Sequence, residues 1–419
     1  MDYARLQKPQ VTICGAGVGG LCLAIGLLQR NVDFILYESA ANFCPTGAGL
    51  SFGPNSLRAM ELLHPELLDR YRWHETKNAY KEKEQNWFEF RHGMAEKENE
   101  VVFGFPKGYT GQSSIHRAML LNELLSLLPT ERIIFNKSVD KIDDPCDVKK
   151  RPTVYFKDGS SVQTDLIVGC DGIKSRVRDS LVGKEHAARF TGKYCYRGIT
   201  DMSLLQSKIG DELALNSVLY MGEHGHVLTY PIDNGKAANI VAFHTKSDGC
   251  WLDKDTTKLL KAEDMLADYN GWSATVQRIL SLVSEPRAWA LFDHHPTPRY
   301  YGHRAAVLGD AAHASTPHQG GGAGQAIEDA LVLSTLLGKL TSPDGVSEAL
   351  RIYDIIRRPR SEKLVRTSRE AGMLYDFEHG TIKDDVDALR ADLSTRFDWI
   401  WNHNPQEQVE EALRLLHKG

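Results

Sequence analysis

The stretch GAGVGG, Gly15–Gly20, decides the fold of this 419-residue chain because of the sequence around it. It follows the apolar run Val11–Cys14, opens the small-residue stretch Leu21–Leu28, and is followed by a second β-like run, Phe34–Tyr37. A strand, a glycine turn, a helix and a second strand form the βαβ unit of a dinucleotide-binding fold. The sequence therefore predicts an α/β protein whose first helix begins beside a bound nucleotide.

Each glycine of this motif has its own expected role. Gly15 allows a tight turn, Gly17 lets the backbone approach a pyrophosphate, and Gly20 lets the helix pack closely on the strand. The helix N-terminus offers free N–H groups to the phosphates. Glu38 ends the second run and is placed to accept hydrogen bonds from ribose hydroxyls, which favours the adenosine of FAD or NAD over NADP.

Two other interpretations of this segment stay open. A glycine-rich loop without a ligand would show the same residues, and residues 11–28 carry no charge, as a membrane segment would. The repeated glycines and the β-like flank argue against membrane insertion.

Composition narrows the class of protein. The length suggests two interlocked domains, and 42% hydrophobic residues suffice to build their cores. A net charge of -5 argues against a nucleic-acid partner. The basic cluster Arg357, Arg358 and Arg360 is interleaved with apolar residues, so we expect a solvated helix face there.

The cysteines and the chain ends predict a cytoplasmic protein. Seven cysteines form no C-x-x-C pair and mostly lie in apolar contexts, which favours reduced, buried thiols. The N-terminal MDYARLQKPQ lacks the plan of a signal peptide, and the C-terminal EEALRLLHKG is typical of an amphipathic helix. We expect no membrane segment.

The rest of the chain alternates strand and helix patterns. Helices are predicted over 52–70 and 115–128, and Arg117 lies in the first turn of the second. Later segments form three groups. The first group consists of short strands at 133–135, 139–142, 154–156 and 166–168. The second consists of alternating runs at 194–200, 218–221, 226–232 and 239–244. The third consists of helices at 324–340 and 347–368. The middle runs predict a second sheet, which we assign to the substrate.

A second glycine motif, CDGIKSRVR, follows the strand at 166–168. Asp171-Gly172 at a strand end makes a sharp turn, in which the acid holds neighbouring backbone and the arginines Arg176 and Arg178 face phosphates. A plain turn with exposed arginines explains the same residues without a ligand.

A third motif, LGDAAHASTP, follows the apolar run Ala305–Leu308 and leads through Gly320–Gly322 into a long helix. A glycine-lined helix N-terminus suits close approach of a flat, electron-accepting ring, and Asp310 is placed to bind ribityl or phosphate-linked hydroxyls. His313 and His318 have no acidic or thiol partner nearby in the sequence, so we expect core or loop histidines and no metal site.

Taken together, these motifs resemble the single-component FAD-dependent aromatic hydroxylases, whose fold is similar to that of para-hydroxybenzoate hydroxylase. The resemblance covers most of the chain. The segments at 196–198 and 226–231, YRG and HVLTYP, resemble those of salicylate hydroxylases, 6-hydroxynicotinate monooxygenases and fungal hydroxylases of polyketide phenols. The resemblance implies a Rossmann-type FAD-binding domain, interleaved with a mixed-sheet substrate domain and followed by C-terminal helices.

The resemblance also implies site residues. Those expected to contact FAD are Glu38, Ala48, Arg117, Asp310 and Ala323, beside Gly15, Gly17, Gly20, Asp171 and Gly322 from the motifs. Arg197 and Tyr230 are expected to serve catalysis. The triple glycine before Ala323 lies at a point where many relatives vary.

The implied chemistry is hydroxylation of an aromatic ring, with NADPH or NADH as reductant and O2 as oxidant. Arg197 is expected to stabilise a phenolate or an adjacent carboxylate, and the alternative is a structural ion pair. Side chains alternate along a strand, so His226, Leu228 and Tyr230 share one face. Tyr230 is expected to bind a substrate oxygen. His226 is expected to accept or relay its proton, unless it is simply bonded to backbone.

The leading hypothesis is conversion of salicylate to catechol with loss of carbon dioxide. Alternatives are hydroxylation, dearomatisation or epoxidation of a larger polyketide phenol and, from another class, a flavin-binding protein without turnover. The expected domains are an FAD-binding part over 1–190, with a substrate-side insertion near 75–110, a substrate sheet over 191–300, and a return to the FAD-binding part with helices over 301–419. We expect a monomer or homodimer.

Overall fold

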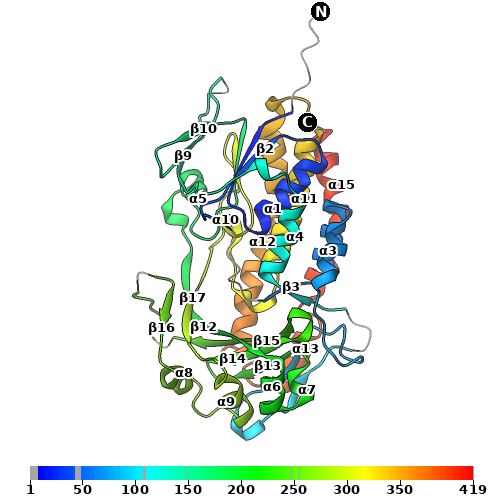
Figure 1. Ribbon diagram of the computed structural model, residues 1–419, viewed down its shortest axis with the longest axis vertical. Helices are drawn as coiled ribbons and strands as arrows, with labels where there is room; N and C mark the ends of the chain where they lie inside the picture. Colours follow the sequence, from blue (N-terminus) through cyan, green and yellow to red (C-terminus); the bar gives the residue numbers. More distant parts are fainter. Residues whose placement is uncertain are drawn as a thin grey trace, which may run out of the picture.

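The computed structural model describes residues 8–42, 49–106, 110–147, 149–246, 248–253 and 255–418. Two lobes lie one above the other, and the long helix α12, Val346–Tyr375, extends along both (Figure 1). A parallel sheet forms the centre of the upper lobe, and a larger, mainly antiparallel sheet forms the centre of the lower lobe. The fold class predicted from the sequence is confirmed.

The upper sheet is parallel throughout. Its strand order is β18-β11-β1-β2-β7. The strands are β1 (Val11–Cys14), β2 (Phe34–Tyr37), β7 (Ile133–Ile134), β11 (Leu166–Gly169) and β18 (Ala305–Val307). Helices cover both faces of such a sheet, which is why its central strands are continuous apolar runs. All three glycine motifs follow strands of this sheet, so they meet at its carboxyl edge.

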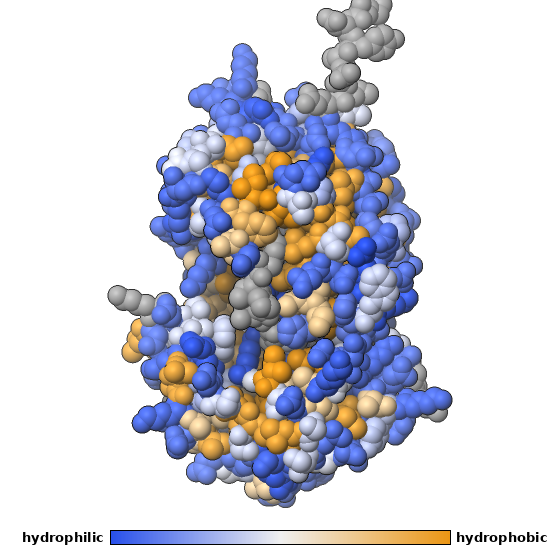
Figure 2. Space-filling view, viewed as in Figure 1, coloured by the Kyte–Doolittle hydropathy of each residue, from blue (hydrophilic) through white to orange (hydrophobic). Residues whose placement is uncertain are grey.

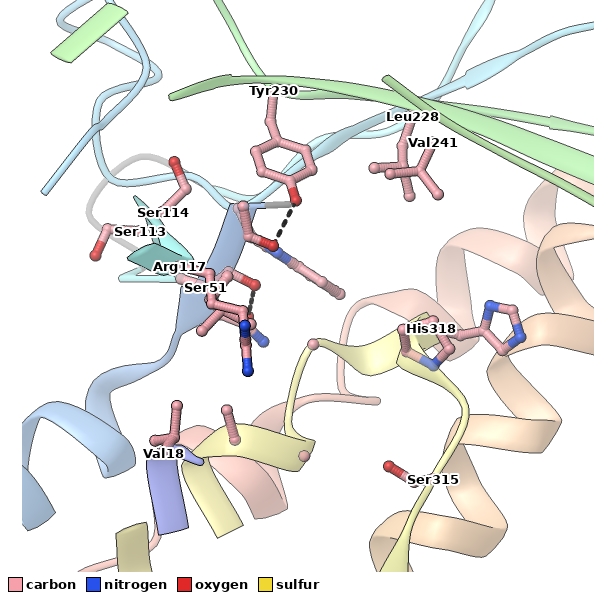
Figure 3. Close-up of a pocket in the computed structure, with 18 of the residues that line it drawn as sticks. Val18, Ser51, Ser113, Ser114, Arg117, Leu228, Tyr230, Val241, Ser315 and His318 are labelled. Atoms are coloured by element: carbon pink, nitrogen blue, oxygen red, sulfur yellow. Dashed lines mark hydrogen bonds between the residues drawn. The ribbon is translucent and has the colours of Figure 1, made fainter. Parts of the chain in front are cut away.

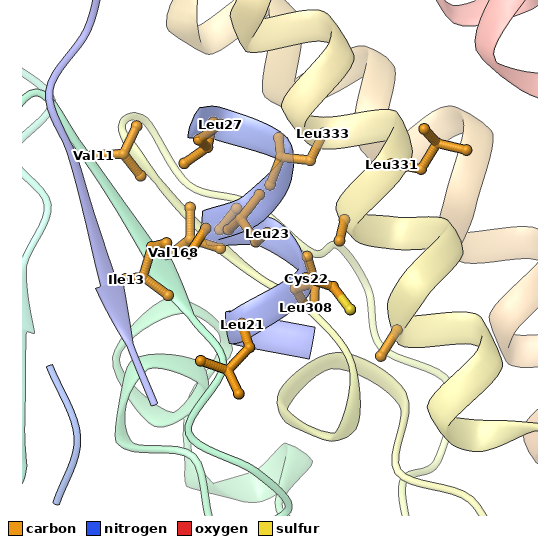
Figure 4. Packing of buried hydrophobic residues seen from close by; sticks show 14 of the residues in the cluster. Val11, Ile13, Leu21, Cys22, Leu23, Leu27, Val168, Leu308, Leu331 and Leu333 are labelled. Carbon is orange, nitrogen blue, oxygen red and sulfur yellow. The ribbon is translucent and has the colours of Figure 1, made fainter. Parts of the chain in front are cut away.

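Helix α1, Val18–Gln29, is apolar on nearly every side because it lies between two layers. Figure 4 shows Leu21, Cys22 and Leu23 between the sheet and helix α11, Gly322–Lys339. The two helices approach so closely that a Cβ on Gly26 would lie 2.4 Å from Ser334 Oγ. This packing fixes the N-terminus of α1 at the carboxyl edge of the sheet.

The lower sheet has the order β16-β17-β12-β15-β14-β13-β4-β5. Its strands are β4 (Glu89–His92), β5 (Val101–Phe103), β12 (Arg189–Asp201), β13 (Val218–Gly222), β14 (Gly225–Ile232), β15 (Ala237–Thr245), β16 (Thr257–Leu259) and β17 (Arg287–Asp293). The four runs predicted for a second sheet thus all belong to it. Two strands from the region near 75–110 complete it, and the domain boundaries themselves stay a prediction.

Two predicted helices differ from the observed ones at their ends. The helix predicted over 52–70 is divided into α2 (Pro54–Leu63) and α3 (Leu67–His74), because Pro65 forces His64 into extended backbone. The helix predicted from 115 begins later, since β6 (Ser113–His116) pairs with β3 (Gly49–Phe52) before α4 (Arg117–Ser126) starts.

The remaining elements lie around these sheets. A separate three-stranded sheet contains β8 (Val139–Asp143), β9 (Thr153–Phe156) and β10 (Ser161–Gln163). The other helices are α5 (Arg176–Val182), α6 (Met202–Ile209), α7 (Asp211–Ala214), α8 (Ala262–Asp268), α9 (Ala274–Leu280), α10 (Asp310–His313), α13 (Val386–Leu393), α14 (Asp398–Trp401) and α15 (Pro405–Leu416). Helix α15 is the amphipathic helix expected at the C-terminus.

The expectation of a solvated basic face on α12 is wrong. Arg357 is fully buried and donates to Glu328 and Asp329 of α11, and Arg360 also donates to Glu328. The acidic partners lie about 30 positions earlier in the chain, so the local pattern of the arginines gives no sign of them.

The cysteines are only partly as expected. The described cysteines are all unpaired, but Cys146 and Cys250 are exposed. On the face seen in Figure 2, apolar residues gather over the upper lobe near α1 and α4, with polar residues around them. Within the described part of the chain, every helix is too short or too polar to cross a bilayer.

Candidate active site

One cavity of about 490 Å³ lies between the carboxyl edge of the parallel sheet and the face of the larger sheet. All three glycine motifs contribute to its lining, through Gly17, Gly172 and Asp310. Figure 3 shows Tyr230, Leu228 and Val241 extending into it from the larger sheet, with Val18 opposite and His318 at another side. Ligands of open α/β sheets bind at this edge, so the position is that expected for a cofactor.

The first motif has the geometry of a phosphate site. Gly15 adopts a φ of +107°, and a Cβ on Gly20 would lie 2.0 Å from the Gly15 carbonyl oxygen. These two glycines therefore permit the turn and the close helix, and neither lines the cavity. Nothing lies within 4 Å of a Cβ built on Gly17, which does line it. This open backbone fits the approach of a pyrophosphate to the N-terminus of α1.

Glu38 lies at the end of β2 and holds the glycine loop. Its Oε2 accepts a hydrogen bond from the Ala16 N–H at 2.7 Å, and its Oε1 accepts one from the Ala40 N–H at 2.8 Å. The contact between Glu38 and a ribose stays a prediction. Ala48 lies outside the described residues.

Asp171 holds its own turn together. The sequence predicted this role for the acid of the second motif. Its carboxylate accepts hydrogen bonds from the backbone N–H groups of Arg176 and Val177 and from the Ser175 hydroxyl. Burial raises the pKa of this carboxyl, and these hydrogen bonds lower it. The acid itself is not part of the cavity lining, although Gly172 beside it is.

Arg178 is buried and does not lie at the cavity, so its expected role toward a phosphate is wrong. It donates to the carbonyl oxygens of Ala311 and Ala312 at 3.3 and 2.9 Å, and to Thr297 Oγ1 at 2.8 Å. The second motif therefore fixes the position of the third.

Asp310 begins α10 after the turn at Gly309, whose φ is +62°. Its carboxylate is open to the cavity yet enclosed by protein. Burial raises its pKa, while the nearby His313 and Arg117 act in the opposite direction. Gly322 and Ala323 line the same cavity at the N-terminus of α11. The third motif thus presents an acid and a glycine-lined helix end to one ligand.

Two arginines lie at the cavity without an acidic partner. Among the described residues, Arg117 and Arg197 form no ion pair with any carboxylate, and both line the cavity. The Arg197 guanidinium lies over the Trp289 ring, 5.8 Å from its centroid, and its Nε is buried with no hydrogen-bond partner in the described part of the chain. The sulfur of Cys195 raises the pKa of Arg197, and burial opposes this. Because a buried charge is costly, an unpaired guanidinium here indicates an anionic ligand.

Tyr230 and His226 lie on β14, but only Tyr230 lines the cavity. The Tyr230 hydroxyl donates to the Gly49 carbonyl oxygen at 3.1 Å, and burial raises its pKa to about 12. His226 is fully buried and lies 2.5 Å, Nδ1 to Oδ1, from Asp376 at the end of α12. The alternative, a His226 side chain that bonds only to backbone, is therefore wrong, because its partner is the Asp376 carboxylate.

His318 is a cavity residue that sequence reasoning set aside. Its ring lines the cavity and lies edge to face with His226, with centroids 5.0 Å apart. Burial and the neighbouring His226 hold its pKa well below the usual range. The signal available in the sequence was the position of His318 directly after the third motif. His313 is also not isolated, because its Nε2 lies 2.6 Å from Asp329 Oδ2.

The fold and the cavity together are typical of an enzyme that binds a nucleotide cofactor at the carboxyl edge of its parallel sheet. Residues 8–368 match the family described as FAD binding domain, and the chain belongs to this family. It is an FAD-dependent aromatic monooxygenase, and dependence on NAD(P)H is typical of its relatives. The alternative of a flavin-binding protein without turnover is thereby set aside.

Two relatives and one solved structure illustrate this. The chain is 40% identical over 416 residues to a 6-methylsalicylate 1-monooxygenase of Aspergillus terreus, covering 98% of this chain and 93% of that protein. It is 35% identical to a salicylate hydroxylase of Pseudomonas putida, covering 98% and 96%. A salicylate hydroxylase substrate complex superposes with a TM-score of 0.87 at 33% identity, covering 97% of this chain and 98% of the other.

Proposed function

We propose that this enzyme hydroxylates a 2-hydroxybenzoate at the carbon that bears the carboxylate, converting salicylate to catechol. NAD(P)H supplies two electrons, one oxygen atom of O2 enters the ring, the other leaves as water, and the carboxylate leaves as carbon dioxide. FAD, when bound, supplies electron transfer and the activation of O2. The supporting observation is Arg197, an unpaired guanidinium of the described cavity that lies near the Tyr230 hydroxyl.

The residues of the cavity divide this work. Arg197 stays cationic at every working pH, so it binds the carboxylate and stabilises the ionised phenol. Tyr230 keeps its proton because its pKa is about 12, and it donates a hydrogen bond to a substrate oxygen when its hydroxyl turns away from the Gly49 carbonyl oxygen. Leu228, Val241 and Phe243 provide apolar contacts for an aromatic ring. We assign the binding of the cofactor to Gly17, Arg117 and Asp310, which line the same cavity.

The test is a substrate panel with two readouts, NAD(P)H consumption and product mass. The panel contains salicylate, 6-methylsalicylate, benzoate without the hydroxyl, and phenol without the carboxylate. We expect both salicylates to accelerate NAD(P)H oxidation and to yield a product in which hydroxyl replaces carboxyl. The proposal fails if neither salicylate gives such a product.

Variants of Arg197 test its assigned role. Arg197→Ala removes a charge-assisted contact of about 1.5 to 3 kcal/mol, so the KM for salicylate is expected to rise by about 10- to 150-fold. Arg197→Lys restores part of this loss. FAD affinity stays unchanged in both variants, because Arg197 is assigned to the substrate.

A larger polyketide phenol is the second candidate substrate. FAD-dependent monooxygenases of the fungi Aspergillus niger and Monascus ruber are 32% and 33% identical to this chain over nearly its whole length. The product mass separates the two candidates, because dearomatisation or epoxidation retains every carbon atom of the substrate. Retention of all carbons with a polyketide phenol, and no reaction with salicylate, would favour this second candidate.

A further inference from the structure

A buried series of charged side chains leads away from the cavity on the side of His226. Asp376 is fully buried and contacts two cationic or basic groups. Its Oδ1 lies 2.5 Å from His226 Nδ1, and its Oδ2 accepts a hydrogen bond from the Lys193 ammonium. None of these three residues lines the cavity, so the cofactor and substrate roles described above do not use Asp376 or Lys193.

The series continues to the surface through Glu378. Lys193 Nζ also donates to Glu378 Oε2 at 2.6 Å, and Lys193 is 6% exposed. The Glu378 side chain is 22% exposed, and its Oε1 lies 3.1 Å from Nδ1 of His224, which is largely exposed. Hydrogen-bonding groups therefore connect buried His226 with solvent.

At the inner end, apolar rings leave His226 few polar neighbours. Phe243 stacks on its ring with centroids 4.3 Å apart, and Tyr375 lies edge to face at 5.2 Å. His226 Nε2 has no hydrogen-bond partner among the described residues, and neither ring nitrogen of cavity-lining His318 has one. Because Asp376 is ionised, His226 Nδ1 donates to it, which leaves Nε2 as a lone pair that can accept a proton.

We propose that Asp376, Lys193 and Glu378 conduct to solvent the proton that a phenolic substrate loses in the cavity, receiving it through His318 and His226. This inference rests on the proposed function, because it requires a phenol that ionises on binding. The proton leaves the phenol oxygen, passes by His318 to His226 Nε2, and His226 gives its Nδ1 proton to Asp376. Lys193 first gives a proton to Glu378, which releases it to water, and the neutral Lys193 amine then takes the proton from Asp376.

This assignment explains why so many buried charges lie beside a catalytic cavity. A buried ion pair contributes little to stability compared with apolar packing of the same volume, which is consistent with an additional functional role for these charges. Burial raises the pKa of Asp376, but His226 and Lys193 more than offset this and hold it at about 2. Asp376 therefore carries a proton only transiently, as a relay group does.

The first experiment uses Glu378→Gln and Asp376→Asn in the FAD-loaded enzyme without NAD(P)H. A salicylate with a nitro group on the ring changes absorbance when its phenol ionises, so rapid mixing gives the ionisation rate on binding. We expect both variants to slow this rate by about tenfold or more while the bound fraction stays unchanged. Glu370→Gln is the matched control, since Glu370 is a partly exposed acid near the end of α12 that pairs with Arg366 and is not part of the proposed relay.

A second measurement separates relay from structural damage. Hydroxylation rates are compared across salicylates of graded phenol pKa, and small diffusible acids and bases are added to the Glu378→Gln variant. We expect the loss to shrink as the phenol becomes more acidic, and the added buffer to restore part of the rate. Equal losses for all substrates, or an ionisation rate that neither variant changes, would overturn the relay.

The relay and the proposed function fail differently. If the unmodified enzyme neither binds nor ionises the nitrosalicylate, the proposed substrate is wrong, and the relay as stated falls with it. If the unmodified enzyme ionises it and both variants do so at the same rate, the substrate stands and the relay alone is wrong.

Discussion

Arg357 Nε donates to Asp329 Oδ1 across 2.7 Å, and both side chains are fully buried. The same carboxylate also accepts hydrogen bonds at Oδ2 from the Gly309 N–H at 3.1 Å and from His313 Nε2. A charge on α12 thus holds the acid that fixes the turn before Asp310. The position of Asp310, the acid that we assign to the cofactor, therefore depends on an ion pair that is not part of the cavity lining.

Arg357→Met is expected to destabilise the protein strongly. The substitution leaves Glu328 and Asp329 buried with one cation fewer, which costs about 3 to 5 kcal/mol. Urea unfolding of the FAD-loaded protein measures this loss. The matched control is Arg358→Met, because Arg358 is partly exposed and pairs with Asp354, so its loss is about 1 kcal/mol or less. Equal losses for the two variants would contradict this account.

Alanine substitutions at two glycines of the first motif are expected to affect different properties, protein stability at Gly20 and FAD binding at Gly17. A Cβ on Gly20 would lie 2.0 Å from the Gly15 carbonyl oxygen, so Gly20→Ala displaces α1 and lowers the thermal unfolding midpoint. Gly17→Ala meets no protein atom within 4 Å and folds normally, but its methyl group occupies space beside the cofactor and weakens FAD binding. Thermal unfolding of the apoprotein and flavin fluorescence titration measure the two effects. A Gly17 variant as unstable as the Gly20 variant would refute the distinction.

Substitution of the two unpaired arginines is expected to affect different ligands: Arg117 the cofactor and Arg197 the substrate. Arg117 lies at the start of α4 beside the glycine motifs, whereas Arg197 lies on β12 of the larger sheet. Removing a charge-assisted hydrogen bond costs about 1.5 to 3 kcal/mol, so Arg117→Ala is expected to raise the Kd for FAD by about 10- to 150-fold. The KM for salicylate at saturating FAD is expected to stay within about twofold, and Arg197→Ala serves as the opposite case. An unchanged Kd in Arg117→Ala would remove Arg117 from the cofactor site.

Local pattern was enough to predict the parts of the fold that depend on neighbours in the chain. The two runs of the βαβ unit coincide with β1 and β2, residue for residue, because a buried parallel strand needs a continuous apolar run. The division of the predicted helix at Pro65 also has a local cause, because a proline disfavours helical backbone at the residue before it, here His64. The prediction of one helix over 52–70 did not take this effect into account.

The candidate site was predictable where a residue stands inside a motif or, as Arg117, Arg197 and Tyr230 do, among the residues that the family resemblance implies. Asp310 and Gly17 line the cavity because each motif follows a strand of the same sheet edge. Asp376 and Lys193, by contrast, lie 183 positions apart and belong to no motif. Their contact depends on α12 packing against the larger sheet, which no short window of sequence encodes.

Acid is expected to remove the stabilisation that Asp376 provides. Its pKa is about 2 in the folded protein, because His226 and Lys193 outweigh the effect of burial, and about 3.9 in an unfolded chain. A carboxyl with a lowered folded pKa stabilises the protein above the unfolded pKa and loses that contribution as pH falls through the folded pKa. The loss between about pH 5 and pH 2 is on the order of 2 kcal/mol.

Comparison of the unmodified protein with Asp376→Asn isolates this contribution, since Asn has no proton to gain. The unfolding free energy of both is measured by urea titration at intervals from about pH 5 downward. Glu328 and Asp329 also have lowered pKa values, and the difference between the two proteins cancels their effect. That difference is expected to narrow as pH falls, because protonated Asp376 can no longer pair with Lys193. A difference that stays constant with pH would mean that Asp376 is not held ionised by its neighbours.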